Sequence, residues 1–460
     1  MNTVVTIMLG ILSVALITYL LLKKADIKVA MFGIGILLLY IASLSGIAVI
    51  KEPVNAFIDP LTSVVSQFKT TLSGAGLVII ILGGYTAYMN QIGANEVTVN
   101  VLTKPLKHVK SSYFLVPVVF LLGNLLSLVI PSASNLAIIL LATLYPVLIK
   151  SKMSPLTAAA VIATTATVMP TPLGSDNVAI AQELGMPVAE YVFNYHAIVS
   201  IPTLFVMAIA HYLWQKYCDK SVVLSDEKYD LENSEDVEKT ELSGVFKFIY
   251  ALLPLLPILI MLLVFILNSS LGIDLKLSVE VVAIISFVIA IICELFRNKQ
   301  FKVTFDKVDF FFKGMGNSMS IVILLIAASV FVSGLKAIGI ITVLQKTMES
   351  TSASGVLLPL ILVLFTAIIV LLSGSGTALF FAMVPLMVPL AAAASISPYA
   401  VTVPMGLAGN LLRAVSPVSA VVMIVAGSTK KEPLEIVKRT SVPMVVGVIF
   451  MLILSFVLFK

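Results

Sequence analysis

The 460-residue chain is poor in the residues that soluble enzymes and secreted domains use for chemistry and cross-linking. It contains two cysteines, Cys218 and Cys293, three histidines and one tryptophan, and only 12% of its residues are charged. Two scattered thiols fit neither a disulfide framework nor a zinc site. His108, His196 and His211 lack metal-ligand spacing, and no His-Glu-x-x-His motif occurs. We therefore expect a protein with no bound cofactor and no enzymatic activity.

Long apolar runs dominate the sequence instead. Hydrophobic residues make up 59% of the chain, which predicts an all-α protein that crosses the membrane many times. The formal charge of +5 fits basic loops outside the bilayer, and we expect no nucleic-acid partner. The first run lacks a basic leading region and a cleavage site, so it is interpreted as a spanning helix. Ten runs are long enough to cross: 2–22, 29–50, 72–90, 155–182, 191–214, 248–268, 278–296, 317–335, 398–428 and 441–459.

The two halves of the chain resemble each other at an offset of 241 to 246 residues. Each half is a hydrophobic unit that Ser, Gly, Asn and Pro interrupt at matching places. Such duplicated breaks are typical of transporters whose binding site lies between inverted repeats. The corresponding segments are 68–93 and 312–339, 132–135 and 373–377, 154–155 and 397–398, and 172–176 and 417–421.

Two further apolar stretches, residues 113–149 and 355–394, are each divided near the middle by a Ser-rich break. An open turn cannot face lipid, because each unpaired amide or carbonyl would cost on the order of several kcal/mol. We therefore predict two re-entrant hairpins whose tips meet polar atoms or water inside the protein. The predicted fold is an inverted repeat with five spanning helices and one re-entrant hairpin in each half.

Basic residues are distributed unevenly between the two sides of this topology. One side carries 22 of the 29 Lys and Arg residues and the other carries six, with Arg413 alone inside a span. The positive-inside rule places the basic side in the cytoplasm and both termini outside. The acidic segment 221–241 is predicted to be a solvated cytoplasmic linker. Residues 97–109 and 302–312 alternate charged and apolar residues at near-helical spacing, which predicts helices lying in the membrane interface.

Short polar side chains gather at the two predicted hairpin tips. A helix begins after each break, and a helix N-terminus offers unpaired N–H donors and about half a positive charge. Two such tips facing each other would suit the two ends of a small dianion. The alternative is that Ser and Gly only permit a sharp turn and close helix packing. The candidate substrate-binding residues of the tips are Ser132, Ser134, Asn135, Ser373, Ser375 and Thr377.

Proline and polar residues also interrupt the spans 155–182 and 398–428. Proline removes an amide donor and frees a carbonyl, so each break exposes polar backbone at midplane depth, where ions can be coordinated. The candidate residues for a coupling cation are Thr171, Ser175 and Asp176, and those for substrate are Asn410, Arg413, Ser416 and Ser419.

Asp176 and Arg413 are the charged residues expected deep in these spans. Charges inside the membrane mark substrate or ion paths, and a guanidinium binds a carboxylate through two parallel hydrogen bonds. Arg413 therefore either binds the substrate or forms a structural ion pair with Asp176. Asp176 either carries a coupling proton, ligates a cation or caps the helix that follows it.

Six short strings are more specific than any composition argument. They are Ala87-Tyr88-Met89 and the segments 92–95, 142–147, 210–215, 416–419 and 438–443. Together they resemble the DcuC family of anaerobic four-carbon dicarboxylate carriers, and the similarity extends along nearly the whole chain. In the wider ion transporter superfamily the tips carry Ser-Asn-Thr, which corresponds loosely to Ser134-Asn135 and Ser375-Gly376-Thr377.

The resemblance implies an elevator, in which the scaffold helices of a homodimer hold a transport domain that slides across the membrane. The divisions that it implies are scaffold parts at 1–112 and 248–354, transport parts at 113–214 and 355–460, and a cytoplasmic linker at 215–247.

The resemblance also implies a substrate class, namely succinate, fumarate, malate or aspartate. These would cross a bacterial inner membrane by exchange or by flux coupled to Na⁺ or H⁺. The residues independently favour an anion, through Arg413 and the paired helix ends. A second hypothesis is export of a larger anionic conjugate, as in the aminobenzoyl-glutamate carriers of similar architecture. A receptor or structural protein would not need the duplicated polar breaks.

Overall fold

The apolar segments form α-helices, and the predicted polar breaks interrupt them. A computed structural model describes residues 3–23, 25–108, 112–168, 170–220, 244–273, 275, 277–343, 354–374 and 376–459. All regular elements within these ranges are helical. The predicted linker at 221–241 lies outside the described residues.

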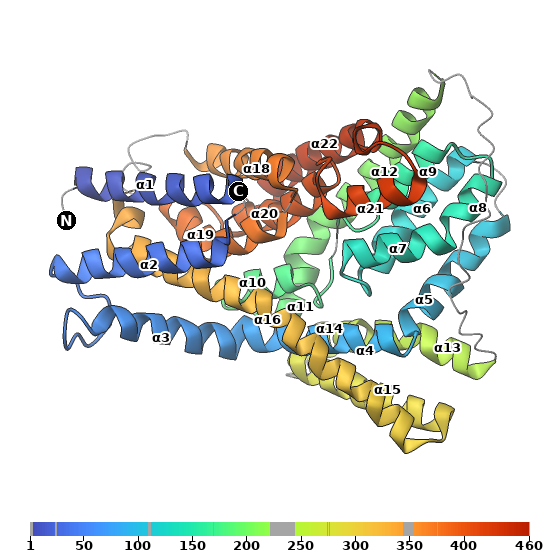
Figure 1. Cartoon of the computed structure of the whole chain (residues 1–460), viewed down its shortest axis with the longest axis horizontal. Helices are drawn as coiled ribbons and strands as arrows, with labels where there is room; N and C mark the ends of the chain where they lie inside the picture. Colours follow the sequence, from blue (N-terminus) through green and yellow to red (C-terminus); the bar gives the residue numbers. More distant parts are fainter. Residues whose placement is uncertain are drawn as a thin grey trace.

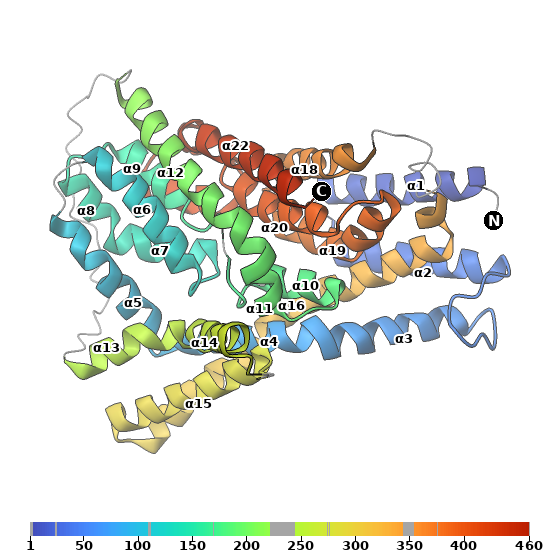
Figure 2. The ribbon, with the colours of Figure 1, turned by 180° about the vertical axis from the view of Figure 1, so that it is seen from behind.

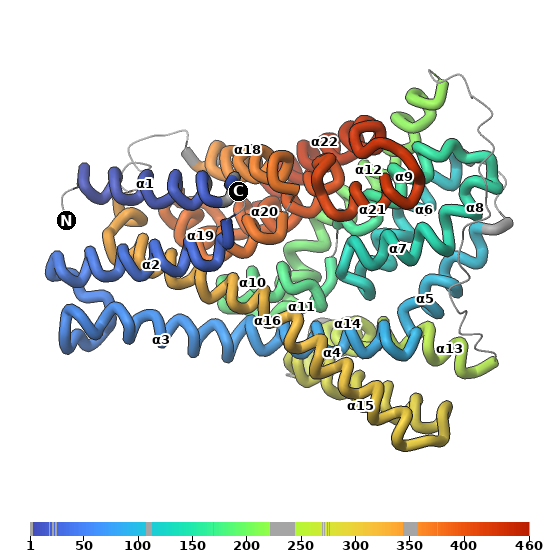
Figure 3. Tube along the Cα trace, viewed as in Figure 1, coloured from blue at the N-terminus to red at the C-terminus, as the bar shows by residue number. Residues whose placement is uncertain are grey.

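In the first half of the chain, helices end where Ser, Gly and Pro were predicted to break them. A π-helical turn, η1 (Leu72–Gly76), joins α3 to α4 across a kink at Gly74, whose ψ of −115° is not helical, and α4 continues along the line of α3 in the trace of Figure 3. The elements are α1 (Thr3–Leu22), α2 (Ile27–Leu44), α3 (Asp59–Thr71), α4 (Leu77–Gln91), α5 (Ala94–Thr103), η2 (Lys104–His108), α6 (Ser112–Ser127), α7 (Ala133–Thr143), α8 (Tyr145–Lys150), α9 (Pro155–Ala163), α10 (Ser175–Leu184), α11 (Val188–Tyr191), η3 (Val192–His196) and α12 (Ala197–Lys220).

The second half repeats this alternation of long and broken helices. Its hairpin is α18 and α19, and its broken span is α20 and α21. The elements are α13 (Val245–Leu252), η5 (Leu253–Leu255), α14 (Leu256–Leu271), α15 (Val279–Asn298), α16 (Phe301–Ala337), α18 (Ser354–Ser373), α19 (Gly376–Ala393), α20 (Tyr399–Arg413), α21 (Ala420–Thr429) and α22 (Pro433–Leu458).

Eight helical stretches in the described ranges are long and apolar enough to cross a membrane. Large apolar side chains on their outer faces are exposed, including Phe205, Leu263 and Phe296. An apolar exterior of this kind suits lipid rather than water. The prediction of an all-α, polytopic membrane protein is therefore confirmed.

The prediction of a separate interfacial helix at 302–312 is wrong. These residues form the start of α16, a single helix of 37 residues that runs on through the predicted span. The alternation of charged and apolar residues has the same period as a spanning helix, and a break between the two would leave backbone groups unpaired. The segment 97–109 falls on α5 and η2, with Val109 outside the described residues, and Thr98 of α5 donates a hydrogen bond to the Ala251 carbonyl of α13.

Helices α4 and α16 cross with their backbones in contact (Figure 1). A Cβ atom added to Gly83 would lie 1.8 Å from the Ser318 hydroxyl oxygen, and one added to Gly314 would lie 2.6 Å from the Gly83 carbonyl oxygen. Only glycine fits this crossing, as is common where membrane helices pack closely. Helices α1–α5 and α13–α16 surround it, and we call them the first helix group.

The remaining helices, α6–α12 and α18–α22, form a second helix group that draws on both halves of the chain. Helix α12 packs along α22 (Figure 2), and α7 and α9 pack against α21. Hydrogen bonds join the halves, since Trp214 Nε1 donates to the Lys438 carbonyl at 3.1 Å and Gln215 Nε2 to the Arg439 carbonyl at 2.8 Å. The hairpins and the broken spans therefore belong to one packed unit, which faces α4 and α16.

Candidate functional site

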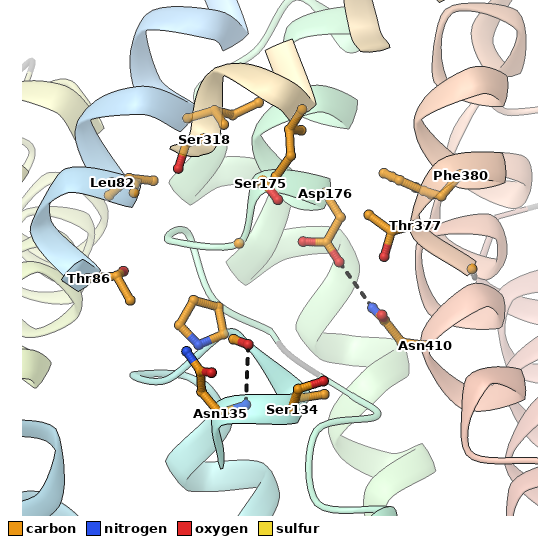
Figure 4. A pocket seen from close by; sticks show the side chains of 18 of the residues that line it. Leu82, Thr86, Ser134, Asn135, Ser175, Asp176, Ser318, Thr377, Phe380 and Asn410 are labelled. Atoms are coloured by element: carbon orange, nitrogen blue, oxygen red, sulfur yellow. Dashed lines mark hydrogen bonds between the residues drawn. The ribbon is translucent and has the colours of Figure 1, made fainter. Parts of the chain in front are cut away.

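A cavity of about 720 Å³ lies between the two helix groups, where the hairpin turns and the broken spans meet α4 and α16 (Figure 4). The structure brings together eight of the thirteen residues that the sequence nominated. Twelve polar residues line the cavity: Thr86, Asn90, Ser132, Ser134, Asn135, Ser175, Asp176, Asn317, Ser318, Thr377, Asn410 and Arg413.

The first hairpin tip presents the start of α7 to the cavity. Ser132 has an extended backbone and caps this helix, because its hydroxyl accepts a hydrogen bond from the Asn135 amide at 3.4 Å. Pro131 precedes the cap and has no amide donor to leave unpaired. Ser134 and Asn135 occupy the first turn of α7, beside the N–H groups that no intrahelical acceptor uses.

The second hairpin tip lies directly on the broken span of its own half. Gly374 has a positive φ of 71°, and a Cβ atom on Gly376 would lie 2.4 Å from the Gly409 carbonyl oxygen of α20. This close approach requires glycine at both positions of the turn. Thr377, in the first turn of α19, lines the cavity, whereas Ser373 ends α18 outside the lining and Ser375 lies outside the described residues.

Asp176 lies in the first turn of α10, after the break in the first span. Its Oδ1 accepts a hydrogen bond from the Asn177 amide at 3.0 Å, and its Oδ2 accepts one from Asn410 Nδ2 of α20 at 3.1 Å. Asp176 is therefore not the residue that caps α10, because Gly174 occupies the cap position. The Asp176 Oδ1 atom pairs with one amide of the first turn, and its Oδ2 faces the other half of the chain. Figure 4 shows this carboxylate pointing into the cavity between Ser175 and Asn410.

Arg413 ends α20 on the cavity wall, and its Nη2 donates to the Ala166 carbonyl at 2.7 Å. That carbonyl is free because the first span is broken there, as the proline argument predicted. The structural ion pair with Asp176 is not formed in the described structure, although the two charges are close enough to interact. A guanidinium has several N–H donors, so the bond to Ala166 leaves donors for a carboxylate.

Three other nominated residues hold the breaks together from behind the cavity. Thr171 is buried, and its hydroxyl accepts from the Leu173 amide and donates to the Leu128 carbonyl. Ser416 donates to the Leu371 carbonyl at 3.1 Å, and Ser419 caps α21. In this arrangement they position the cavity-lining residues rather than line the cavity.

Four polar residues on the wall formed by α4 and α16 were missed. Thr86 and Asn90 belong to α4, and Asn317 and Ser318 belong to α16. Their signal was present, because Asn inside an apolar span is costly unless it has a partner. Freed backbone groups mark hairpin tips and broken spans, and continuous helices such as α4 and α16 lack them.

A buried cation was also missed, since the spans predicted from sequence leave Arg439 in a cytoplasmic loop. It lies in α22, and its Nη1 forms an ion pair with Asp219 Oδ1 of α12 at 2.6 Å. The two side chains are only 6% and 7% exposed. Thr157 Oγ1 donates to the same carboxylate at 3.0 and 3.1 Å. Arg413 is therefore not the only arginine among the described helices, but among the cavity-lining residues it is the one cation and Asp176 the one carboxylate.

Two solved transporter structures share this fold. Neisseria gonorrhoeae MtrF, described as one of a class of antimetabolite efflux pumps, aligns over 93% of this chain and 94% of its own, with a TM-score of 0.64 and 14% identity. The Alcanivorax borkumensis YdaH transporter, described as having an unusual topology, aligns over 94% of this chain and 98% of its own, with a TM-score of 0.62 and 16% identity. At this identity the likeness concerns the fold alone.

Sequence relatives are more specific. A DcuC anaerobic C4-dicarboxylate transporter of Escherichia coli K12 is 33% identical over 458 residues, which are 98% of this chain and 96% of that protein. A probable DcuC transporter of Vibrio cholerae is 34% identical over 459 residues, 98% of this chain and 97% of that protein. The model of the DcuC family, described as C4-dicarboxylate anaerobic carriers, matches residues 4–460. The chain therefore belongs to the DcuC family of carriers, which are membrane transporters and not enzymes.

Proposed function

We propose that this chain is a secondary transporter of the small dicarboxylates succinate, fumarate, malate and aspartate. The observation that carries the proposal is the cavity at which both hairpin tips and both broken spans converge, with Arg413 on its wall. The Escherichia coli relative, a C4-dicarboxylate transporter, supports the substrate class. Exchange of one dicarboxylate for another is the favoured mode, with optional coupling to a proton.

The lining suits a molecule with a carboxylate at each end. Arg413 offers N–H donors to one carboxylate. The N-termini of α7 and α19 offer amide donors and a positive dipole end to the other, with Ser134 and Thr377 hydroxyls beside them. A dianion bound in this way is oriented along the line between these groups, which favours short dicarboxylates over monocarboxylates.

Asp176 supports the coupling part of the proposal. A carboxylate on the wall of a cavity for anions repels the substrate unless it is protonated or paired with a cation. Asn410 can accept or donate a hydrogen bond, so it can serve both protonation states of Asp176. Sodium is the alternative coupling ion, bound by oxygens of Ser134, Ser175 and Asp176. Thr171 would then stabilise the break between α9 and α10 through its hydrogen bonds to Leu128 and Leu173.

For the movement, we propose an elevator in which the second helix group slides along α4 and α16 while the first group holds a homodimer in a bacterial inner membrane. The inverted repeats account for two equivalent end states. The excess of Lys and Arg on one predicted side supports a cytoplasmic central linker and outside termini. In this proposal residues 1–112 and 248–354 are the scaffold parts and residues 113–214 and 355–460 the transport parts, and the packing of the two helix groups supports that division. The predicted linker at 215–247 is shorter than proposed, because α12 runs to Lys220 and α13 begins at Val245.

A second candidate function is export of a larger anionic conjugate of the aminobenzoyl-glutamate type. The cavity of about 720 Å³ lies in the range that accommodates drug-sized ligands, roughly 300 to 1,000 Å³. MtrF, which shares the fold, is described as an antimetabolite efflux pump. A competition assay distinguishes the two candidates. If the conjugate is the substrate, it should inhibit the exchange of labelled succinate at a lower concentration than unlabelled succinate does.

The deciding experiment measures uptake of labelled succinate into proteoliposomes that contain the purified chain. Internal fumarate, an inward sodium gradient and an inward proton gradient are imposed one at a time. We expect internal fumarate to give the fastest uptake. If none of the four dicarboxylates is taken up under any gradient, the proposed function is wrong.

A further inference from the structure

Four buried polar groups of the second helix group lie outside the cavity lining, on α11, η3, α12 and α20. They are the Tyr191 hydroxyl, His196 Nδ1, the Ser200 hydroxyl and the Thr402 hydroxyl. Each side chain is no more than 2% exposed, and none of these four atoms has a hydrogen-bond partner within the described protein. Buried polar groups in proteins are paired with very few exceptions, and bound water usually supplies the partner when protein does not.

These groups form a line rather than a scatter. The Tyr191 and His196 rings meet edge to face with centroids 6.1 Å apart. Ser200 follows His196 by four residues, so both lie on the same face of the helix. Thr402 lies on α20, which packs against η3, and its hydroxyl is close to that of Tyr191 without reaching hydrogen-bond geometry.

The line reaches the cavity along α20. Thr402, Gly406 and Asn410 are spaced by four residues, so they share one face of that helix. Asn410 binds Asp176, Gly406 lines the cavity, and a Cβ atom on Gly406 would lie 4.0 Å from the Tyr191 hydroxyl oxygen. The Ile180 Cδ1 atom lies nearer to that Cβ position, at 3.1 Å, so a side chain at position 406 would press on Ile180 and fill part of the space beside the Tyr191 hydroxyl.

At its other end the line approaches the surface. Tyr195 and Tyr399 stack with ring centroids 3.7 Å apart, and both are partly exposed, as is Glu190 beside them. The proposed topology puts this end outside the cell. Asp176, Tyr191 and His196 are then the titratable groups along the line, with Arg413 beside Asp176 and Glu190, Tyr195 and Tyr399 at the surface.

We propose that water fills this line, which we call the polar seam, and that it conducts the coupling proton between Asp176 and the outside. The inference rests on the proposed function and deepens it. Each hydroxyl can accept one hydrogen bond and donate another, so a proton taken up from bulk water outside moves inward as each water or hydroxyl accepts one proton and passes another on. The last group in the line protonates the Asp176 carboxylate, and every hydroxyl keeps the number of protons that it had.

Sodium is the other occupant that this position might suggest, but the chemistry of the seam disfavours it. Hard cations take oxygen ligands and usually a carboxylate. The seam itself offers three hydroxyls and an imidazole nitrogen, and its nearest carboxylate, Asp176, already binds Asn177 and Asn410.

The test uses the full chain in proteoliposomes with a pH-sensitive dye inside. Tyr191→Phe and Thr402→Val each remove one hydroxyl and keep the shape of the side chain. Tyr88→Phe is the matched control, because the Tyr88 hydroxyl of α4 is also buried and unpaired but lies outside both the seam and the cavity lining. Two rates are measured for each variant: succinate exchange against internal fumarate, and proton influx with succinate under an inward pH gradient.

We expect Tyr191→Phe and Thr402→Val to slow proton influx by about tenfold, the effect of losing one hydrogen bond worth about 1.4 kcal/mol from the path. Exchange should stay within about twofold of wild type, since neither residue lines the cavity. Thr402→Ser, which retains a hydroxyl, should restore proton influx, and Tyr88→Phe should change neither rate.

Wild-type proton influx in both seam variants would overturn the inference, as would equal slowing by Thr402→Ser and Thr402→Val. Exchange without any proton influx in the wild-type chain would also overturn it, while leaving dicarboxylate transport intact. Absence of exchange in the wild-type chain would instead remove the proposed function itself, and the seam's role with it.

Discussion

Asn410 donates a hydrogen bond to Asp176 at 3.1 Å, and this contact joins two residues that lie 234 positions apart, one in each half of the chain. The broken spans therefore meet through an amide and a carboxylate rather than through opposite charges. An ion pair would hold Asp176 ionised, whereas an amide partner permits it to gain and lose a proton. The cavity thus combines one cation that can hold an anion with one acid that can titrate.

Asp176→Asn should remove the proton-coupled part of transport and spare exchange. Asparagine keeps the size and hydrogen-bonding capacity of the side chain but cannot titrate. We expect no net succinate uptake driven by a pH gradient, and exchange against internal fumarate near the wild-type rate. Uptake assays at several pH values check this. A strict sodium requirement for exchange, with Asp176→Asn unaffected at every pH, would contradict proton coupling.

Arg413→Ala should abolish dicarboxylate transport. Two charge-assisted hydrogen bonds to a carboxylate, at about 1.5 to 3 kcal/mol each, correspond to a loss of at least about 100-fold in the exchange rate at low substrate concentration. Arg413→Lys should recover little, because a point charge cannot bind both Ala166 and a carboxylate in the same fork. Size-exclusion chromatography in detergent checks that the variants are folded. A folded alanine variant with near wild-type exchange would show that Arg413 has no essential role.

Arg439→Ala should destabilise the protein without any direct effect on the cavity. Removing one partner of a buried ion pair leaves the Asp219 carboxylate without an opposite charge and with hydroxyl partners alone, and loss of a buried partner costs about 3 to 5 kcal/mol. Lys313→Ala is the control, since Lys313 and Asp309 pair at 2.8 Å with side chains 61% and 58% exposed. Such exposed pairs contribute about 1 kcal/mol or less. Thermal unfolding in detergent, followed by fluorescence, should therefore show a much larger loss for Arg439→Ala. Equal losses in both variants would contradict the assignment.

Single cysteines report the proposed topology once Cys218 and Cys293 have been replaced. A cysteine at Lys51, in the exposed loop between α2 and α3, should react in intact cells with a thiol reagent that does not cross membranes. One at Lys299, in the exposed turn between α15 and α16, should react only after the cells are opened. The reverse pattern would invert the topology and place the central linker outside.

Sequence reasoning predicted the helices and their breaks well, because apolar length and the absence of backbone donors at proline are local properties. It nominated Ser175, Asp176, Asn410 and Arg413 at the breaks, and these residues line one cavity. It failed where the outcome depends on packing between distant segments. The direct partner of Asp176 is Asn410 rather than Arg413, and Arg439 is buried because Asp219 of another helix meets it.

The polar residues of α4 and α16 that line the cavity were also not predicted from the sequence. Asn317 and Ser318 lie on a helix without any break. A polar residue in an apolar span indicates a polar partner, but the local sequence does not say whether that partner is a substrate or a neighbouring helix. The sequence of α16 also hid its length, since charged residues at its start have the same helical period as the span. Only the crossing with α4, set by Gly83 and Gly314, brings these polar side chains to the cavity.

That crossing has a consequence for amide hydrogen exchange during the transport cycle. With the Gly314 Cβ position 2.6 Å from the Gly83 carbonyl oxygen, neither helix can slide past the other by a residue without overlap of main-chain atoms. The amides around Gly83 and Gly314 should therefore be the slowest to exchange, and their protection should be the same with and without substrate. Amides at the tips, near Asn135 and Thr377, should instead gain protection when substrate binds, which would distinguish the helices that we propose to move from those that we propose to stay at rest.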